Sequence, residues 1–120
     1  MIEALLVVVS VAALSAGAWA WTSVPAPALL AAGAWLVGGG LAFGLPTGLV
    51  YHVALRRSLL AVGALPRRWW LHPLSLHPRL PDDAAPRVLL WCRLGALGCG
   101  IAFLGCAVFA LGAFRLLVAR

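Results

Sequence analysis

The sequence predicts an all-α integral membrane protein: one polytopic domain (1–120) with a cytoplasmic loop rich in Pro, Arg and Trp and three transmembrane helices at about residues 2–21, 28–55 and 88–117. The 120 residues are 64% hydrophobic and only 10% charged, whereas about a quarter of the residues in a soluble domain are charged. No charged side chain occurs between Ala4 and Leu55. Residues 94–114, between Arg93 and Arg115, are also uncharged. About 20 consecutive apolar residues suffice to cross a bilayer, so both stretches are long enough.

The first expected helix, residues 2–21, has the length that a hydrocarbon core of about 30 Å requires at about 1.5 Å per residue. Ala18-Trp19-Ala20 resembles the cleavage site of a signal peptide. However, the residues before the apolar run include Glu3 and no Arg or Lys, unlike the basic start of a signal peptide. We therefore expect an uncleaved span, with Trp19 and Trp21 at its interfacial end.

The second expected helix, residues 28–55, follows a proline-rich turn at 22–27. It is longer than one bilayer thickness. We expect it either to tilt or to leave the membrane in its last turns, continuing as an interfacial helix through Arg56 and Arg57. Pro46 removes one backbone hydrogen bond inside this helix and predicts a kink.

The third expected helix contains a seven-residue repeat, LGALGCG, IAFLGCA and VFALGAF, over residues 94–114. Bulky residues occupy the a and d positions of this heptad, and small residues form a separate stripe. A period of 3.5 residues keeps such stripes aligned with a neighbouring helix along a left-handed crossing. Because Phe109 interrupts the small stripe, we expect close contact only over its cytoplasmic two-thirds.

Small residues also line the other two helices. Membrane helices associate through the close packing of small residues, because lipid tails solvate Leu as well as protein does. The first helix carries Ala12, Ala16 and Ala20 at four-residue spacing. The glycine-zipper-like candidates for helix packing in the other two are Gly40, Gly44, Gly48, Gly95, Gly98, Ala102 and Gly105.

Three such stripes exceed what three helices need internally, which indicates that at least one face docks on another protein or on a second copy. The alternative is that Gly and Ala are simply frequent in membrane helices encoded by GC-rich genomes. All nine basic residues are Arg and none is Lys, which favours such a genome and a bacterial source.

The arginine distribution predicts the orientation. Six arginines lie in the connection 56–87, and only Arg115 and Arg120 lie on the other side. Since positive residues near span ends stay cytoplasmic, we expect the loop and the N-terminus inside and the C-terminus outside a bacterial inner membrane. The net charge of +6 then concentrates at one membrane face. This concentration of positive charge favours anionic lipids as partners, and we expect no nucleic acid binding.

The loop LPRRWWLHPLSLHPRLPDDAAPR is stiffened by prolines and contains the near-repeat LHPLS, LHPRL. Paired aromatic and basic side chains suit either the headgroup layer or a partner protein, and we weigh both equally. The docking candidates are Arg56, Arg57, Arg67, Arg68, Trp69 and Trp70. Asp82 or Asp83 is expected to cap the helix that begins near Pro86.

Residues that could carry chemistry are few. His52, beside Tyr51, could ligate haem or contact a quinone; the simpler interpretation is an interfacial histidine bonded to headgroups or to a carbonyl freed near Pro46. The loop also contains four possible metal ligands, His72, His77, Asp82 and Asp83. Their spacing matches no strong ligand pattern, so we expect no metal site there. The three cysteines, Cys92, Cys99 and Cys106, are spaced by seven residues. On a helix the Cα atoms of successive cysteines would be about 10.5 Å apart, too far for an internal disulfide.

These observations favour a small non-catalytic accessory or structural subunit of a larger membrane protein complex, which contacts partner helices through its small-residue faces. No catalytic constellation and no resident cofactor are expected. One alternative is a haem- or quinone-associated redox accessory subunit that uses His52. A further alternative is a homo-oligomeric small pore or carrier, assembled through the groove at Gly40, Gly44 and Gly48.

Overall fold

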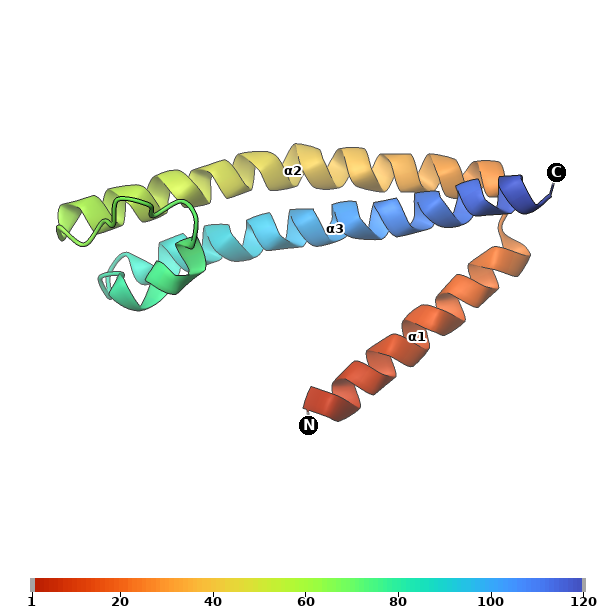
Figure 1. Cartoon of the computed structure of the whole chain (residues 1–120), viewed down its shortest axis with the longest axis horizontal. Coiled ribbons are helices and arrows are strands. Elements are labelled where there is room, and N and C mark those ends of the chain that lie inside the picture. Colours follow the sequence, from red (N-terminus) through yellow and green to blue (C-terminus); the bar gives the residue numbers. More distant parts are fainter. Residues whose placement is uncertain (1, 120) are drawn as a thin grey trace. The chain divides into compact units, whose positions relative to one another are not determined.

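The computed structural model describes residues 2–119, which form helices and connecting turns without any β-strand (Figure 1). The elements in chain order are α1 (Ile2–Ser23), α2 (Ala26–Ala61), the 3-10 helix η1 (Pro73–Arg79) and α3 (Ala85–Val118). Each of the three α-helices is long and apolar enough to cross a membrane. The prediction of three long apolar helices is therefore confirmed. Arg120, which entered the charge count, lies outside the described residues.

All three helices extend beyond the predicted bounds, and the connection between α2 and α3 is correspondingly shorter than 56–87. Arg56 and Arg57 belong to α2, which ends only at Ala61. The predicted bound at residue 55 was too early, whereas the expectation that the helix could continue through Arg56 and Arg57 agrees with the extent of α2. α2 also runs through Pro46 without interruption.

Gly63 ends α2. Its φ of 67° lies in the left-handed region, which glycine adopts without the steric penalty of a Cβ. The Gly63 amide donates to the Leu60 carbonyl at 3.1 Å, and the Ala64 amide donates to the Leu59 carbonyl at 3.0 Å. This pair of bonds is a Schellman motif, which satisfies carbonyls left free at a helix end.

Ala84, and not an aspartate, directly precedes the first residue of α3. A turn closes just before the helix, because the amides of Ala84 and Ala85 both donate to the Pro81 carbonyl, at 3.0 and 2.9 Å. The Ala84 carbonyl then accepts from the Val88 amide at 3.1 Å. Asp83 is exposed on this turn.

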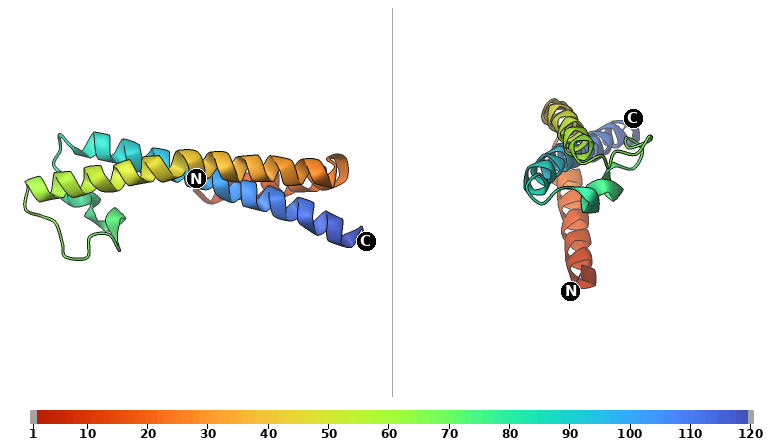
Figure 2. Two further views of the ribbon diagram at one scale, coloured as in Figure 1. Left: turned by 90° about the horizontal axis from the view of Figure 1, so that it is seen from above. Right: turned by 90° about the vertical axis from the view of Figure 1, so that its left-hand side faces the viewer.

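The chain divides into two compact units, with the division after Val37 in α2 and after Phe103 in α3. In the unit Gly38–Phe103, the segments of α2 and α3 run antiparallel and side by side, and η1 folds back beside them (Figures 1 and 2). Its core contains side chains from all three elements: Tyr51, Leu55, Leu59, Leu76, Leu80 and Val88. The loop is therefore an ordered part of this unit.

The other unit joins α1 to the beginning of α2 and the end of α3. No residue of α1 is buried. Near its C-terminal end, the Trp21 ring lies 5.7 Å from the Phe114 ring, and the Arg115 guanidinium lies 5.7 Å from the centre of the Trp21 ring. Arg115 Nη1 also donates to the Val24 carbonyl in the turn between α1 and α2. These contacts connect α3 to the α1–α2 turn.

Candidate functional site

In the unit Gly38–Phe103, glycines bring the backbones of α2 and α3 into direct contact. A Cβ added to Gly40 would lie 2.5 Å from the Ala102 nitrogen and 2.8 Å from the Gly98 carbonyl oxygen. One added to Gly44 would lie 3.2 Å from the Gly98 Cα. At Gly40 a Cβ would therefore force the two backbones apart, whereas at Gly44 it would make a tight contact that requires a shift of a few tenths of an ångström.

The same seam continues to Gly95, where an added Cβ would lie 3.3 Å from the Gly48 Cα. The Gly48 side of this contact is more open, since a Cβ there would meet no atom within 4 Å. Thr47, beside it, is buried, and its hydroxyl donates to the Phe43 carbonyl at 2.8 Å. The α2–α3 seam in this unit therefore combines glycines with one polar residue satisfied within its own helix.

Close approach also occurs in the other unit. A Cβ on Gly105 would lie 2.6 Å from the Val37 nitrogen, and one on Gly112 would lie 3.0 Å from the Leu30 nitrogen. The expectation that Phe109 restricts close contact was wrong. Gly33 faces Phe109, with an added Cβ only 2.5 Å from the Phe109 nitrogen. A glycine on the opposing helix thus accommodates the position where α3 lacks a small residue.

The small stripe of α3 faces α2. Gly98 and Gly105 are buried, whereas the residues directly before them, Leu97 and Leu104, are each 57% exposed. In both units, therefore, the small-residue stripes of α2 and α3 pack against each other within one chain. The groove at Gly40 and Gly44, considered above for a second copy, is occupied by α3.

The small-residue stripe of α1 is not filled in this way. It borders an apolar groove of about 530 Å³, which we call the α1 groove. Ala13, Ala16, Gly17 and Ala20 form its α1 side, and Leu104 and Val108 are among the residues opposite. A Cβ on Gly17 would meet no atom within 4 Å.

His52 and Tyr51 lie at a junction with the loop. The Tyr51 hydroxyl and His77 Nε2 share a hydrogen bond of 2.8 Å. His52 Nδ1 lies 2.8 Å from the Gly48 carbonyl oxygen, and because a carbonyl only accepts, Nδ1 carries the proton. The His52 ring is 5.0 Å from the Tyr51 ring and 6.2 Å from the Trp69 ring. Two loop residues thus join the pair that the sequence indicated.

The loop candidates differ in exposure. Trp69 is half-buried and packs against the core of its unit, whereas Trp70 is 61% exposed. The arginines proposed for docking are all exposed: Arg56, Arg57, Arg67 and Arg68. Only Arg57 of this set lines a pocket together with residues of α3, so the six candidates do not form one site.

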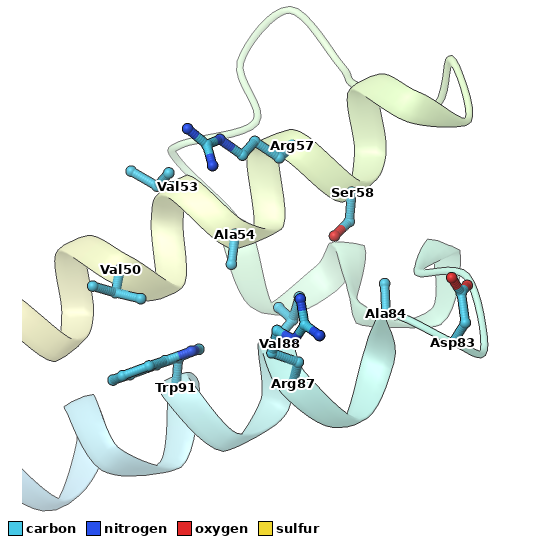
Figure 3. A pocket seen from close by; sticks show the side chains of 10 residues that line it. All are labelled: Val50, Val53, Ala54, Arg57, Ser58, Asp83, Ala84, Arg87, Val88 and Trp91. Carbon is cyan, nitrogen blue, oxygen red and sulfur yellow. The ribbon is translucent and has the colours of Figure 1, made fainter.

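That pocket, which we call the basic pocket, has a volume of about 370 Å³ and lies between α2 and α3 (Figure 3). Arg57 and Ser58 come from α2, and Arg87 and Trp91 come from α3. The sequence pattern did not indicate Arg87 or Trp91 as site residues. The spacing of four between them is a signal that they share a helix face, but the identity of the facing helix was needed to place Arg57 beside them.

The sequence predicts no metal site and no disulfide within the chain. Residues 2–119 contain no group of three or more His, Cys, Asp or Glu side chains placed to hold a metal ion. Cys92, Cys99 and Cys106 are free thiols, the last two exposed. Comparison of the chain with protein-family models, with curated proteins and with solved structures finds no match.

Proposed function

We propose that this protein is a small structural subunit of a larger membrane assembly, which binds an apolar transmembrane helix of a partner in the α1 groove. The observation that carries the proposal is the contrast between the helix seams. The glycine stripes of α2 and α3 are filled by each other, whereas the small-residue side of α1 borders an open groove.

The chemistry of the α1 groove suits a helix. Its α1 side runs from Ala13 to Ala20, about 10 Å or two helical turns at about 1.5 Å per residue. Small side chains allow a second backbone to approach closely, which drives helix association in lipid. The opposite wall, including Leu104 and Val108, supplies the larger side chains against which a partner would pack.

In this proposal all three helices cross the membrane. Arg56, Arg57 and the loop arginines lie on the cytoplasmic side, together with the N-terminus, and the C-terminus lies outside. The membrane is the inner membrane of a bacterium. The partner is another membrane protein subunit, and no step of catalysis is assigned to this chain.

Photo-crosslinking tests the proposal. A photoreactive residue at Ala16, inside the α1 groove, should cross-link to one apolar helix of a partner, identified by peptide mass spectrometry. The same probe at Ala110, an exposed position of α3, is the matched control and should not give that product. Gly17→Leu should abolish the cross-link, because a leucine would occupy the groove, and its Cβ would meet no other atom of this chain within 4 Å.

Cross-linking from Ala16 only to lipid would contradict the proposal, and so would an undiminished cross-link in Gly17→Leu. Gly100→Leu serves as the control substitution, because a Cβ there also meets no atom within 4 Å and Gly100 does not line the α1 groove. Its cross-link should equal that of the wild-type chain.

A second candidate function, a haem- or quinone-associated redox accessory, is favoured by one observation. With the proton on Nδ1 and donated to the Gly48 carbonyl, His52 presents an unprotonated Nε2, which is the nitrogen arrangement of many metal-bound histidines. An absorption spectrum of the protein with its partners tests this. A Soret band that disappears in His52→Ala is expected if haem binds there, and absence of the band would overturn the haem form of this candidate.

A further inference from the structure

We propose that the basic pocket binds the phosphate group of an anionic phospholipid, with the acyl chain lying toward Val50 and Trp91. The inference is independent of the proposed function, because it concerns a different unit of the chain and no residue of the α1 groove.

The basic pocket is formed by one face of each helix. Val50, Val53, Ala54, Arg57 and Ser58 of α2 line it, at the spacing of three and four residues that keeps side chains on one helical face. Ala84, Arg87, Val88 and Trp91 line it from the other side with the same spacing. Two antiparallel helices therefore place cationic and apolar side chains in matching order along the pocket.

The order of these side chains follows the order of groups in a phospholipid. Val50 lies opposite Trp91 at one end, and Arg57 and Arg87 come next toward the ends of their helices (Figure 3). The apolar end adjoins the uncharged part of α2, which continues back to Ala26. A lipid with its acyl chain at the apolar end would have its phosphate in the part of the pocket that Arg57 and Arg87 line.

The charges of the pocket favour an anion. Arg57 and Arg87 bring two positive charges to one pocket, and both would attract an anion bound there. Arg57 and Arg87 are both exposed, and each can present two parallel N–H donors to phosphate oxygens. Asp83 also lines the pocket, at the end away from Val50 and Trp91 (Figure 3), so the lining carries two positive charges and one negative charge. Ser58 adds a hydroxyl donor beside the cations.

The apolar lining distinguishes a lipid from a free phosphate ion. Inorganic phosphate would make no apolar contact with Val50, Val53 and Trp91, whereas an acyl chain would be covered by these side chains. Trp91 is half-buried beside Arg87, and tryptophan is enriched at the level of lipid headgroups. Basic pockets between membrane helices are a known form of anionic headgroup recognition, and the volume of about 370 Å³ falls within the range of about 300–1,000 Å³ for ligand sites.

The test uses the full chain in mild detergent, titrated with phosphatidylglycerol and followed by native mass spectrometry. The wild-type protein should retain one phosphatidylglycerol molecule more strongly than phosphatidylcholine with the same acyl chains. Arg57→Gln combined with Arg87→Gln should weaken retention about tenfold or more, since charge-assisted hydrogen bonds are lost. Trp91→Ala should weaken phosphatidylglycerol retention while the arginines remain in place.

The matched control is Arg79→Gln combined with Arg93→Gln, which removes the same charge from exposed positions outside the basic pocket. Its retention should stay within about twofold of wild type. Equal losses in the two double variants would overturn the proposal, because the effect would then be one of net charge. Displacement of phosphatidylglycerol by an equal concentration of inorganic phosphate would overturn the lipid assignment.

Thermal unfolding of each variant keeps these outcomes interpretable. If Arg57→Gln with Arg87→Gln does not fold, Arg57→Lys with Arg87→Lys replaces it. The lysine variant keeps both charges but loses the paired donors, and it should retain phosphatidylglycerol less well than wild type. Unchanged retention in a folded lysine variant and in Trp91→Ala would contradict the site.

Discussion

The Tyr51 hydroxyl and His77 Nε2 share a hydrogen bond of 2.8 Å, although 26 residues separate them in the chain. The bond joins α2 to η1 beside a core in which Leu55 is completely buried and Leu76 is 5% exposed. The near-repeat LHPLS, LHPRL is therefore not symmetric in the structure. His77 of the second copy is bonded, whereas His72 of the first is exposed and precedes η1.

The Tyr51–His77 bond should stabilise the folded loop. We expect Tyr51→Phe to lower the free energy of unfolding by about 0.5–1.5 kcal/mol, the net value of a typical intramolecular hydrogen bond. His77→Ala should cost at least as much, and the double variant should cost less than the two single changes together. Proteolysis of the segment between Ala61 and Ala85 measures these differences. Additive effects would show that the two residues act independently.

The α2–α3 seam leads us to predict opposite effects on stability when two glycines of α3 are replaced by alanine. Gly98→Ala should destabilise the protein by about 1–3 kcal/mol, as overpacking of a well-packed contact does, because the new Cβ would meet the Gly44 backbone and the Gly40 carbonyl. Gly100→Ala has open space around its Cβ and should be neutral or stabilising, since alanine favours helix by about 1 kcal/mol over glycine. Thermal unfolding in detergent compares them, and equal melting temperatures would contradict the seam.

Arg115 is expected to stabilise the turn between α1 and α2. Arg115→Met keeps an apolar stem but removes the donor to the Val24 carbonyl and the cation over Trp21. A hydrogen bond to a charged group contributes about 1.5–3 kcal/mol, so exchange of the Ala28 and Leu29 amides should accelerate about tenfold or more. Arg93→Met, at an exposed position of α3, should leave that exchange unchanged. No difference between the two variants would argue against this role of Arg115.

The proposed orientation predicts which positions are accessible from each side. In a variant with its three cysteines replaced by alanine, Ser75→Cys should react with a membrane-impermeant maleimide only in inside-out vesicles. Ser23→Cys, also exposed, should react only in right-side-out vesicles, because the proposed orientation puts the turn after α1 on the outside. The reverse pattern would contradict the assignment of the loop to the cytoplasm.

The contacts between α2 and α3 show how far sequence periodicity alone can predict helix packing. The seven-residue repeat of α3 indicated one stripe of small residues and one of bulky residues. The order of apolar and charged residues along the chain indicated three helices. Periodicity did not show which partner the small stripe meets. It also led to the wrong expectation for Phe109, because Gly33, which accommodates it, lies on another helix.

The sequence by itself determined the number of long apolar helices, since the length and composition of an uncharged stretch follow from local order along the chain. Only the tertiary structure decided that the glycines of α2 and α3 face each other, that Tyr51 meets His77, and that Arg57 and Arg87 line one pocket. Each of these joins residues from different elements. Such pairs depend on how the helices align, and the spacing of residues within one helix does not specify that alignment.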